Sequence, residues 1–190
     1  LWAQKEACSQ EIAAYAQQEC AEAVALFERP TDTVYTSLQA PSNIITQITS
    51  RIKDLPSGSA IYIESPYFTD SAFAQSLLAA LQRKIKVYMV LNSQHAQTKK
   101  FVKPLHAAGA HIYYATVHQH AKRCVIASPG GLHDCCFLGS HNYSAAAHYQ
   151  IELVICTEHN PEQVQQHIQQ FHGLIENLSN RDGAGAALSV

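Results

Sequence analysis

The chain has 190 residues, 47% of them hydrophobic, with 13 Lys and Arg against 15 Asp and Glu. These values fit one folded domain with a sizeable core, and they exclude a disordered or fibrous protein. The formal charge of -2 also excludes a protein that holds nucleic acid by bulk positive charge, so any phosphate site must be local.

The first thirty residues read as a helix, because apolar residues recur every three or four positions from Ile12 to Phe27 and the pattern stops before Pro30. We therefore expect a helical extension at 1–30, packed on the domain or on a second copy of the chain. Its polar face carries more Glu than Lys, which makes it a poor binder of anionic membranes. Residues 31–179 are expected to form the domain, and the Gly- and Ala-rich residues 180–190 a flexible tail.

Strand and helix signals alternate from Thr31 onward, which is typical of an α/β protein with a largely parallel sheet. We expect strands at 33–36, 60–64, 85–91, 111–115, 123–127, 135–138 and 150–156. The expected helices are one capped near Ser42 that carries Ile44 to Ile52, one from Thr69-Asp70 to Leu81, one at 98–108 ending at Gly109, and one opened by Asn160-Pro161.

The compartment is suggested by two features of the chain. It has no apolar run near the roughly 20 residues of a membrane helix, and it begins at Leu1 rather than Met, so we expect a missing leader or anchor. This favours the bacterial cell envelope, the periplasm or secretion over the cytoplasm. Six cysteines leave an oxidising compartment open, but on one helix Cys8 and Cys20 would lie about 18 Å apart, beyond disulfide reach. They read better as small core residues.

The first chemical motif is His120-Ala121-Lys122, which leads into an apolar strand. Period-two alternation places the imidazole and the ammonium on one side, with Cα atoms about 6 to 7 Å apart. The imidazole can then attack a phosphorus atom while the ammonium holds a phosphoryl oxygen. The alternative for this pattern alone is an ordinary surface strand.

The second motif follows a turn at Ser128 to Gly131 and reads Gly139-Ser140-His141-Asn142. If the two strands pair antiparallel, the Ser140 hydroxyl and the Asn142 amide return to His120 and can donate to the same phosphate, while Gly139 permits a close backbone approach. An ordinary turn is the alternative. Glu152 is expected inside a strand, where a carboxylate needs a partner, and His120 Nδ1 is a plausible one.

These residues, in this order, resemble the phospholipase D superfamily, specifically its small single-motif members, which include bacterial endonucleases and mitochondrial phosphodiesterases. The resemblance covers roughly 34–177, and Ser65 to Thr69 is similar to the family's aromatic-Thr segment, which makes Tyr67 a candidate substrate-binding residue. It implies an α/β sandwich with a mixed central sheet flanked by helices. The family has an aspartate five residues after the lysine, mainly a structural support, where this chain has Ala127; Asp134 is a candidate substitute.

The resemblance implies metal-independent phosphodiester hydrolysis through a phosphohistidine, with no cofactor. His120 is the expected nucleophile, Lys122, Ser140 and Asn142 stabilise the phosphoryl oxygens, and Glu152 orients the histidine. The competing chemistry is a metal site, because His118, Cys124, His133, Cys135 and Cys136 lie along the same hairpin. No CxxC knuckle or HxxxH helix is present and Cys135 and Cys136 would face opposite sides of a strand, so we expect no metal.

Local positive charge indicates the substrate. Lys99 and Lys100, together with Lys103, Arg83, Lys84 and Lys86, favour a nucleic-acid backbone and hence a nuclease. A phospholipid headgroup is the second enzymatic hypothesis, and a non-catalytic scaffold, motivated by Ala127, is the third.

The number of histidines suggests the assembly. The reaction needs one histidine to attack and one to protonate the leaving group, yet the chain has one motif copy. A symmetric homodimer with a shared active site supplies the second. His118 or His141 acting within one chain is the monomeric alternative.

Overall fold

The computed structural model describes residues 32–36, 44–92, 96–115, 119–150 and 152–181. The strands are β1 (Asp32–Thr36), β2 (Ala60–Ser65), β3 (Lys86–Asn92), β4 (His111–Ala115), β5 (Arg123–Ala127), β6 (Cys135–Gly139) and β7 (Leu153–Glu158). The helices are α2 (Ile44–Lys53), α3 (Ser71–Gln82), α4 (Ala96–Ala107), α5 (Pro161–Arg181) and a 3-10 helix, η1 (Ala145–Tyr149). The predicted extension at 1–30, with Cys8 and Cys20, and the cap at Ser42 lie outside the described residues.

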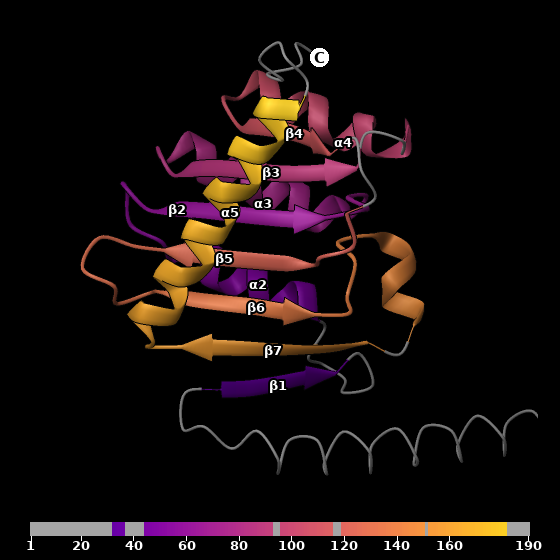
Figure 1. Ribbon diagram of the computed structural model, residues 1–190. Helices are drawn as coiled ribbons and strands as arrows, with labels where there is room; N and C mark the ends of the chain where they lie inside the picture. Colours follow the sequence, from indigo (N-terminus) through magenta and orange to yellow (C-terminus); the bar gives the residue numbers. More distant parts are fainter. Residues whose placement is uncertain (1–31, 37–43, 93–95, 116–118, 151, 182–190) are drawn as a thin grey trace, which may run out of the picture.

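The seven strands form one mixed sheet in the order β1-β7-β6-β5-β2-β3-β4 (Figure 1). Only β2, β3 and β4 run parallel to one another, and the other neighbouring pairs are antiparallel. The mixed α/β sheet is thus confirmed, whereas the largely parallel sheet suggested by the alternating signals was wrong. The second half of the chain departs from parallel pairing because a short turn between β5 and β6 can only join antiparallel strands.

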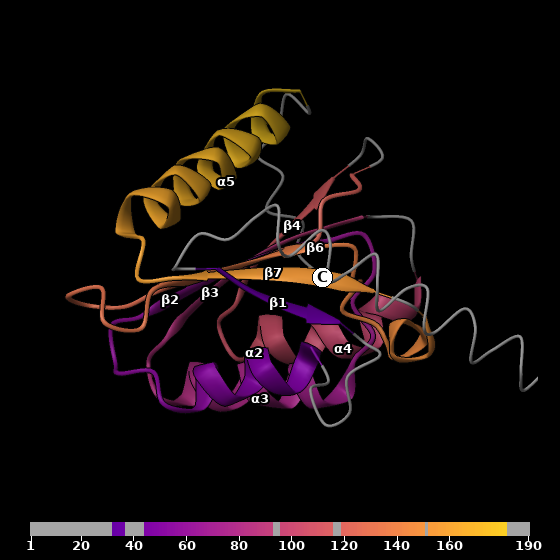
Figure 2. The same cartoon turned by 90° about the horizontal axis from the view of Figure 1, so that it is seen from below.

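Helices cover both faces of the sheet (Figure 2): α2, α3 and α4 lie on one face and α5 crosses the other. The larger core lies on the first face, where Ile48 of α2 and Phe73 of α3 are fully buried with Ile61 of β2. On the other face α5 packs Phe171 and Leu178 against the sheet. Cys135 belongs to the first core and Cys136 to the α5 side, as the alternation of a strand predicts.

The local signals for helix ends are confirmed. Asp70 caps α3 by accepting a hydrogen bond from Phe73 N at 2.7 Å, and Asn160 caps α5 through Gln163 N at 3.0 Å. Gly109 follows α4 with a φ of 100°, a left-handed conformation that favours glycine.

Most boundaries differ from the prediction by one or two residues, and the start of the last strand differs by three. The last strand begins at Leu153 rather than Gln150, because its neighbours β6 and β1 end opposite Val154 and Leu153 and leave earlier residues without a partner strand. The residues before it include η1, which the sequence pattern did not indicate. Helix α5 continues to Arg181, and the domain boundary at 179 stays a prediction.

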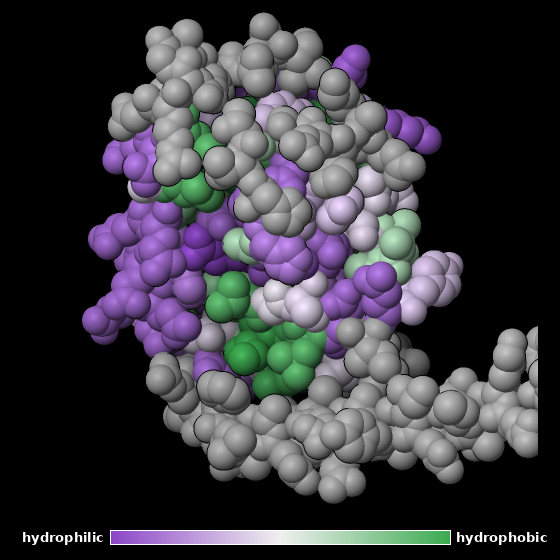
Figure 3. Space-filling model, turned by 45° about the vertical axis from the view of Figure 1, so that its right-hand side comes forward, coloured by the Kyte–Doolittle hydropathy of each residue, from purple (hydrophilic) through white to green (hydrophobic). Residues whose placement is uncertain are grey.

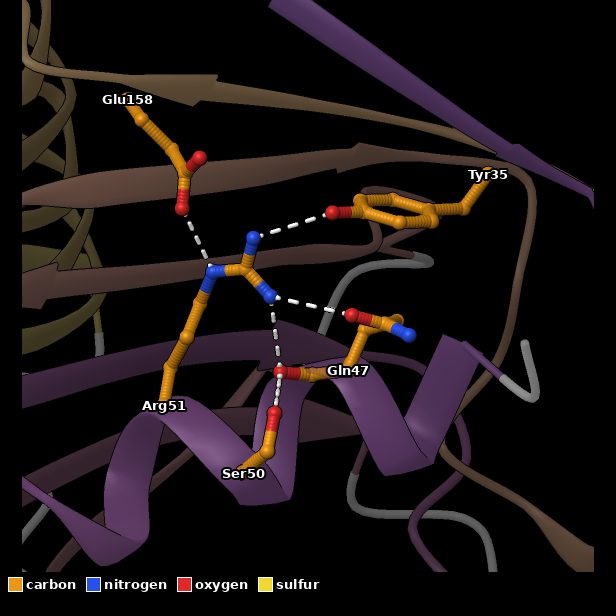
Figure 4. Close-up of polar contacts among 5 residues, drawn as sticks. All are labelled: Tyr35, Gln47, Ser50, Arg51 and Glu158. Carbon is orange, nitrogen blue, oxygen red and sulfur yellow. Dashed lines mark hydrogen bonds and ion pairs between the residues drawn. The ribbon is translucent and has the colours of Figure 1, made fainter. Parts of the chain in front are cut away.

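One arginine connects α2 to the far edge of the sheet (Figure 4). Arg51 Nε lies 2.7 Å from Glu158 Oε1 of β7, and its terminal nitrogens donate to Tyr35 Oη of β1 at 2.9 Å and to Gln47 of α2. The guanidinium also lies 5.2 Å from the centre of the Phe137 ring. A half-buried cation with this many partners should stabilise the edge strand β1.

Replacing Arg51 with methionine should lower the free energy of unfolding by about 2 kcal/mol, because Glu158 and Tyr35 lose their charged partner. Urea denaturation measures this loss. Lys53→Met, an exposed substitution on the same helix, is the matched control and should change stability by less than about 0.5 kcal/mol. Equal effects of the two substitutions would contradict the prediction.

Candidate active site

His120 and Lys122 lie side by side at the end of the sheet where β2 ends and β5 begins. Lys122 Nζ lies 3.2 Å from His120 Nδ1 and 3.3 Å from His120 Nε2, and it donates to the His120 carbonyl oxygen at 2.7 Å. The predicted placement on one side is therefore confirmed, although both residues precede β5 rather than belong to it. The lysine is only 6% exposed, whereas His120 is open to solvent.

The segment that carries His120 is anchored by the end of β3. Asn92 Oδ1 accepts from Gln119 N and Asn92 Nδ2 donates to Gln119 O, both at 3.2 Å, so this buried amide imitates one rung of a strand pair. The Gln119 side chain donates to the Ala121 carbonyl at 3.1 Å. Sequence reasoning missed Asn92; the available signal was a polar residue closing an otherwise apolar strand.

The second motif returns to Lys122 through the β5–β6 pair. Gly139 N donates to the Lys122 carbonyl at 3.3 Å, and the next residue, Ser140, donates through its hydroxyl to Glu152. The Ser140 hydroxyl oxygen also accepts from Leu153 N at 3.1 Å. The structure thus brings Lys122, Ser140 and Glu152 to one place, with Glu152 buried just before β7 rather than inside a strand. Its predicted contact with His120 stays a prediction.

Gly139 is required by close backbone packing. A Cβ atom at this position would lie 2.1 Å from the Leu153 carbonyl oxygen and 2.7 Å from Val154 Cα. The glycine therefore lets β7 approach β6, and its predicted role in letting the backbone approach a phosphate is not needed to explain it.

The electrostatics of the site centre on Lys122. Burial lowers the pKa of Lys122 below its ordinary value, and the nearby Glu152 carboxylate opposes that change. A poorly hydrated ammonium beside an exposed imidazole is well suited to stabilise an incoming anion, because little water must be displaced.

The remaining positions of the second motif, His141 and Asn142, are buried and half-buried. The Asn142 side-chain oxygen is buried and has no hydrogen-bond partner among the described residues. His141 is 2% exposed, and burial together with the charge of His148 lowers its pKa to about 4. Both causes disfavour the protonated form of His141; His118, the other histidine of the monomeric alternative, lies outside the described residues.

Asp134 lies near Ala127, at the other end of the β5–β6 hairpin from the motif. Its Oδ1 accepts from Ser128 N at 2.7 Å and from the Ser128 hydroxyl at 3.1 Å. The Asp134 carboxylate, just before β6, therefore stabilises the hairpin turn by binding Ser128, the residue that follows Ala127.

Two of the predicted substrate-binding residues, Tyr67 and Lys100, follow the strands that end at the same end of the sheet as Lys122. Tyr67 is exposed in the loop after β2. Glu64 near the end of β2 pairs with Arg123 at the start of β5, so this loop lies at the end of the sheet that carries Lys122. Lys100 is exposed near the start of α4, which follows the end of β3 at the same end of the sheet. Nothing is described of the Lys99 side chain.

Three of the basic residues expected to help bind the substrate do not lie at this end of the sheet. Lys84 precedes β3 and Lys86 is its first residue, so both lie at the opposite end of the sheet from His120. The Arg83 guanidinium is occupied by the carbonyl oxygens of Ile52, Lys53 and Leu55 at the end of α2. These three residues therefore do not add to the positive charge at the end of the sheet that carries His120.

Within the described ranges, no three His, Cys, Asp or Glu side chains are arranged to hold a metal ion. Burial raises the pKa of Cys124 well above its ordinary value, so this thiol is a core residue. None of the described helices is both long and apolar enough to span a membrane.

Several solved structures share this fold. The protein Nuc from Salmonella typhimurium, described as a phospholipase D family member, aligns with a TM-score of 0.64 and 16% identity over 75% of this chain and 91% of that chain. NucT from Helicobacter pylori aligns with a TM-score of 0.59 and 17% identity over 76% and 95%. A polyphosphate kinase from Porphyromonas gingivalis aligns with a TM-score of 0.58 and 18% identity, covering 82% of this chain and 24% of the kinase.

Residues 51–175 match the family described as "Cardiolipin synthase, PLD-like domain", and this range contains all five residues from His120 to Glu152 that we predict to form the site. Among curated proteins, no sequence matches. The family match covers more than half of the chain, and the sheet and both motifs agree with it. The chain therefore belongs to the phospholipase D superfamily of phosphodiesterases.

Proposed function

We propose that this protein hydrolyses phosphodiesters without a metal ion, through a covalent phosphohistidine at His120. The observation that carries the proposal is the contact between Lys122 and the His120 ring at the edge where Ser140 and Glu152 converge. An exposed imidazole offers a nucleophile, and a buried ammonium offers charge stabilisation for the phosphoryl oxygens.

The reaction proceeds in two displacements. An imidazole nitrogen of His120 forms a bond to phosphorus, the bond from phosphorus to the leaving oxygen breaks, and a second histidine gives that oxygen its proton. Water then attacks phosphorus and gives its proton to the second histidine, and the nitrogen–phosphorus bond breaks. Lys122 and Asn142 hold the charged oxygens in both steps. The Ser140 hydroxyl has one proton, which it donates to Glu152, so it joins them when it turns that proton to a phosphoryl oxygen.

The second histidine is His120 of the partner subunit in a symmetric dimer. An apolar row supports this assembly: Leu138, Ile155 and Val34 are register partners on β6, β7 and β1, on the face that α5 leaves partly open. Leu138 is 45% exposed and directly precedes Gly139. Figure 3 shows a hydrophobic patch low on this side of the molecule. A two-fold contact through this row would run close to the motif, because Leu138 pairs with Arg123, the residue after Lys122.

Sedimentation equilibrium tests the dimer. The active species should sediment at twice the chain mass of 20.9 kDa, and Leu138→Lys should convert it to an inactive monomer. Leu132→Lys, an exposed substitution at the hairpin turn, is the control and should leave the dimer intact. Full activity in a monomeric species would refute the shared site.

The preferred substrate is nucleic acid. Supporting this choice, Tyr67 and Lys100 are exposed and follow the ends of β2 and β3; a cation and an aromatic ring can hold a phosphate backbone and a base. A phospholipid headgroup is the second candidate, and it is favoured by the family description, which names cardiolipin synthase.

Parallel assays on single-stranded DNA, duplex DNA, cardiolipin vesicles and phosphatidylcholine vesicles, each with and without EDTA, separate these substrates. We expect cleavage of DNA that EDTA leaves unchanged. Cleavage of vesicle lipid alone would support the phospholipid candidate. Activity lost on chelation and restored by a divalent ion would refute the metal-independent mechanism, and a folded protein that turns over no phosphodiester would support a scaffold.

A further inference from the structure

The loop that carries Ser140 and Asn142 is held by a second loop that the motif does not include. The Tyr143 carbonyl oxygen accepts from Thr69 N at 2.8 Å and from Asp70 N at 3.2 Å. Phe68 and Tyr143 also form an isolated parallel bridge. The segment between β2 and α3 is therefore attached to the loop that follows β6.

Asp70 lies at the junction of the two loops. It is 4% exposed, and each carboxylate oxygen has a partner: Oδ1 accepts from Phe73 N, and Oδ2 lies 2.5 Å from His148 Nε2 in η1. A buried carboxylate needs such partners, since burying its charge without them is costly. One side chain therefore contacts both the start of α3 and η1, the 3-10 helix that follows the loop carrying Ser140 and Asn142.

His141 completes the contact from inside the motif. Its ring packs on that of His148 in a T-shaped arrangement, with centroids 5.8 Å apart, and also lies near the Tyr143 ring at 6.5 Å. His148 therefore touches Asp70 on one side and the motif residue between Ser140 and Asn142 on the other. Displacing His148 should therefore shift His141 and, with it, the positions of the neighbouring Ser140 and Asn142.

We propose that Asp70 and His148 are positioning residues whose side-chain contact fixes the loop 139–144 and so holds Ser140 and Asn142 in place for the phosphoryl group. This inference rests on the proposed function and deepens it, because it assigns a role to two residues outside both motifs. The physical reason is that η1 begins at Ala145 and its N-cap residue, Ser144, makes no side-chain capping hydrogen bond, so the loop takes its rigidity from contacts with the neighbouring loop.

The test compares His148→Ala, His148→Gln and Asp70→Asn with the wild type. Asp70→Asn keeps the cap acceptor of α3, and the side-chain amide introduced by His148→Gln can still donate to Asp70, so both variants should fold. Tyr149→Ala is the matched control, because Tyr149 belongs to the same 3-10 helix and is 93% exposed. Two readouts are needed: amide hydrogen exchange at Thr69 and Asp70, and kcat and KM for bis(p-nitrophenyl) phosphate.

We expect His148→Ala to accelerate exchange of the two amides about tenfold and to lower kcat about tenfold with little change in KM. His148→Gln should recover most of both, and the double variant Asp70→Asn/His148→Ala should be no worse than the more impaired single variant, since the two residues act as one contact. Unchanged exchange in His148→Ala, or additive losses in the double variant, would overturn the proposal. A wild type without turnover would refute the proposed function instead, while the exchange rates would still test the contact.

Discussion

Replacing His120 with alanine is expected to abolish phosphodiester hydrolysis, with a loss of at least about a thousandfold in kcat. The residue provides the nucleophile in one subunit and the leaving-group acid in the other, so a single substitution removes both groups from a shared site. Lys122, which contacts the ring, should remain in place because Asn92 anchors the segment through Gln119 rather than through His120.

The covalent intermediate makes this expectation specific. Wild-type protein quenched during turnover should carry an acid-labile phosphoramidate on His120, detectable by mass spectrometry of the peptide, and His120→Ala should carry none. His106→Ala, a substitution of an exposed histidine on α4, is the control and should retain wild-type kcat. A phosphorylated residue other than His120, or substantial turnover by His120→Ala, would refute the assigned nucleophile.

Replacing Lys122 with methionine should lower kcat by about a hundredfold or more, because it removes the charge that stabilises the phosphoryl oxygens while nearly keeping the side-chain volume. The buried ammonium contacts His120, so arginine, whose planar head is larger, should not restore full activity. Steady-state kinetics on bis(p-nitrophenyl) phosphate measure the loss, with Lys103→Met on the exposed face of α4 as the control.

The pH dependence provides a second test of Lys122. Activity requires the protonated ammonium, and burial lowers its pKa, so activity should fall as pH rises through a value below the ordinary lysine pKa of 10.5. Glu152 opposes the shift, and Glu152→Gln should therefore move the alkaline limb to still lower pH. A limb above 10.5, or one that Glu152→Gln leaves in place, would contradict this assignment.

Much of the architecture was predictable because its determinants are local. The apolar spacing of Ile44 to Ile52, the Asp70 and Asn160 caps and Gly109 each act within a few residues, and each lies where the pattern predicted. The same holds for His120 and Lys122, whose common side follows from their separation by one residue.

The sequence by itself determined the family and both motifs. His120-Ala121-Lys122 and Gly139-Ser140-His141-Asn142 lie close together in the chain, at the start and the end of one hairpin. Tertiary structure alone decided which distant groups support them. Asn92 reaches Gln119, and Asp70 reaches His148, across 27 and 78 positions of the chain. The tertiary structure also placed Lys84 and Lys86 at the opposite end of the sheet from the site. Such pairings depend on strand order and on the packing of loops, and no local periodicity encodes either.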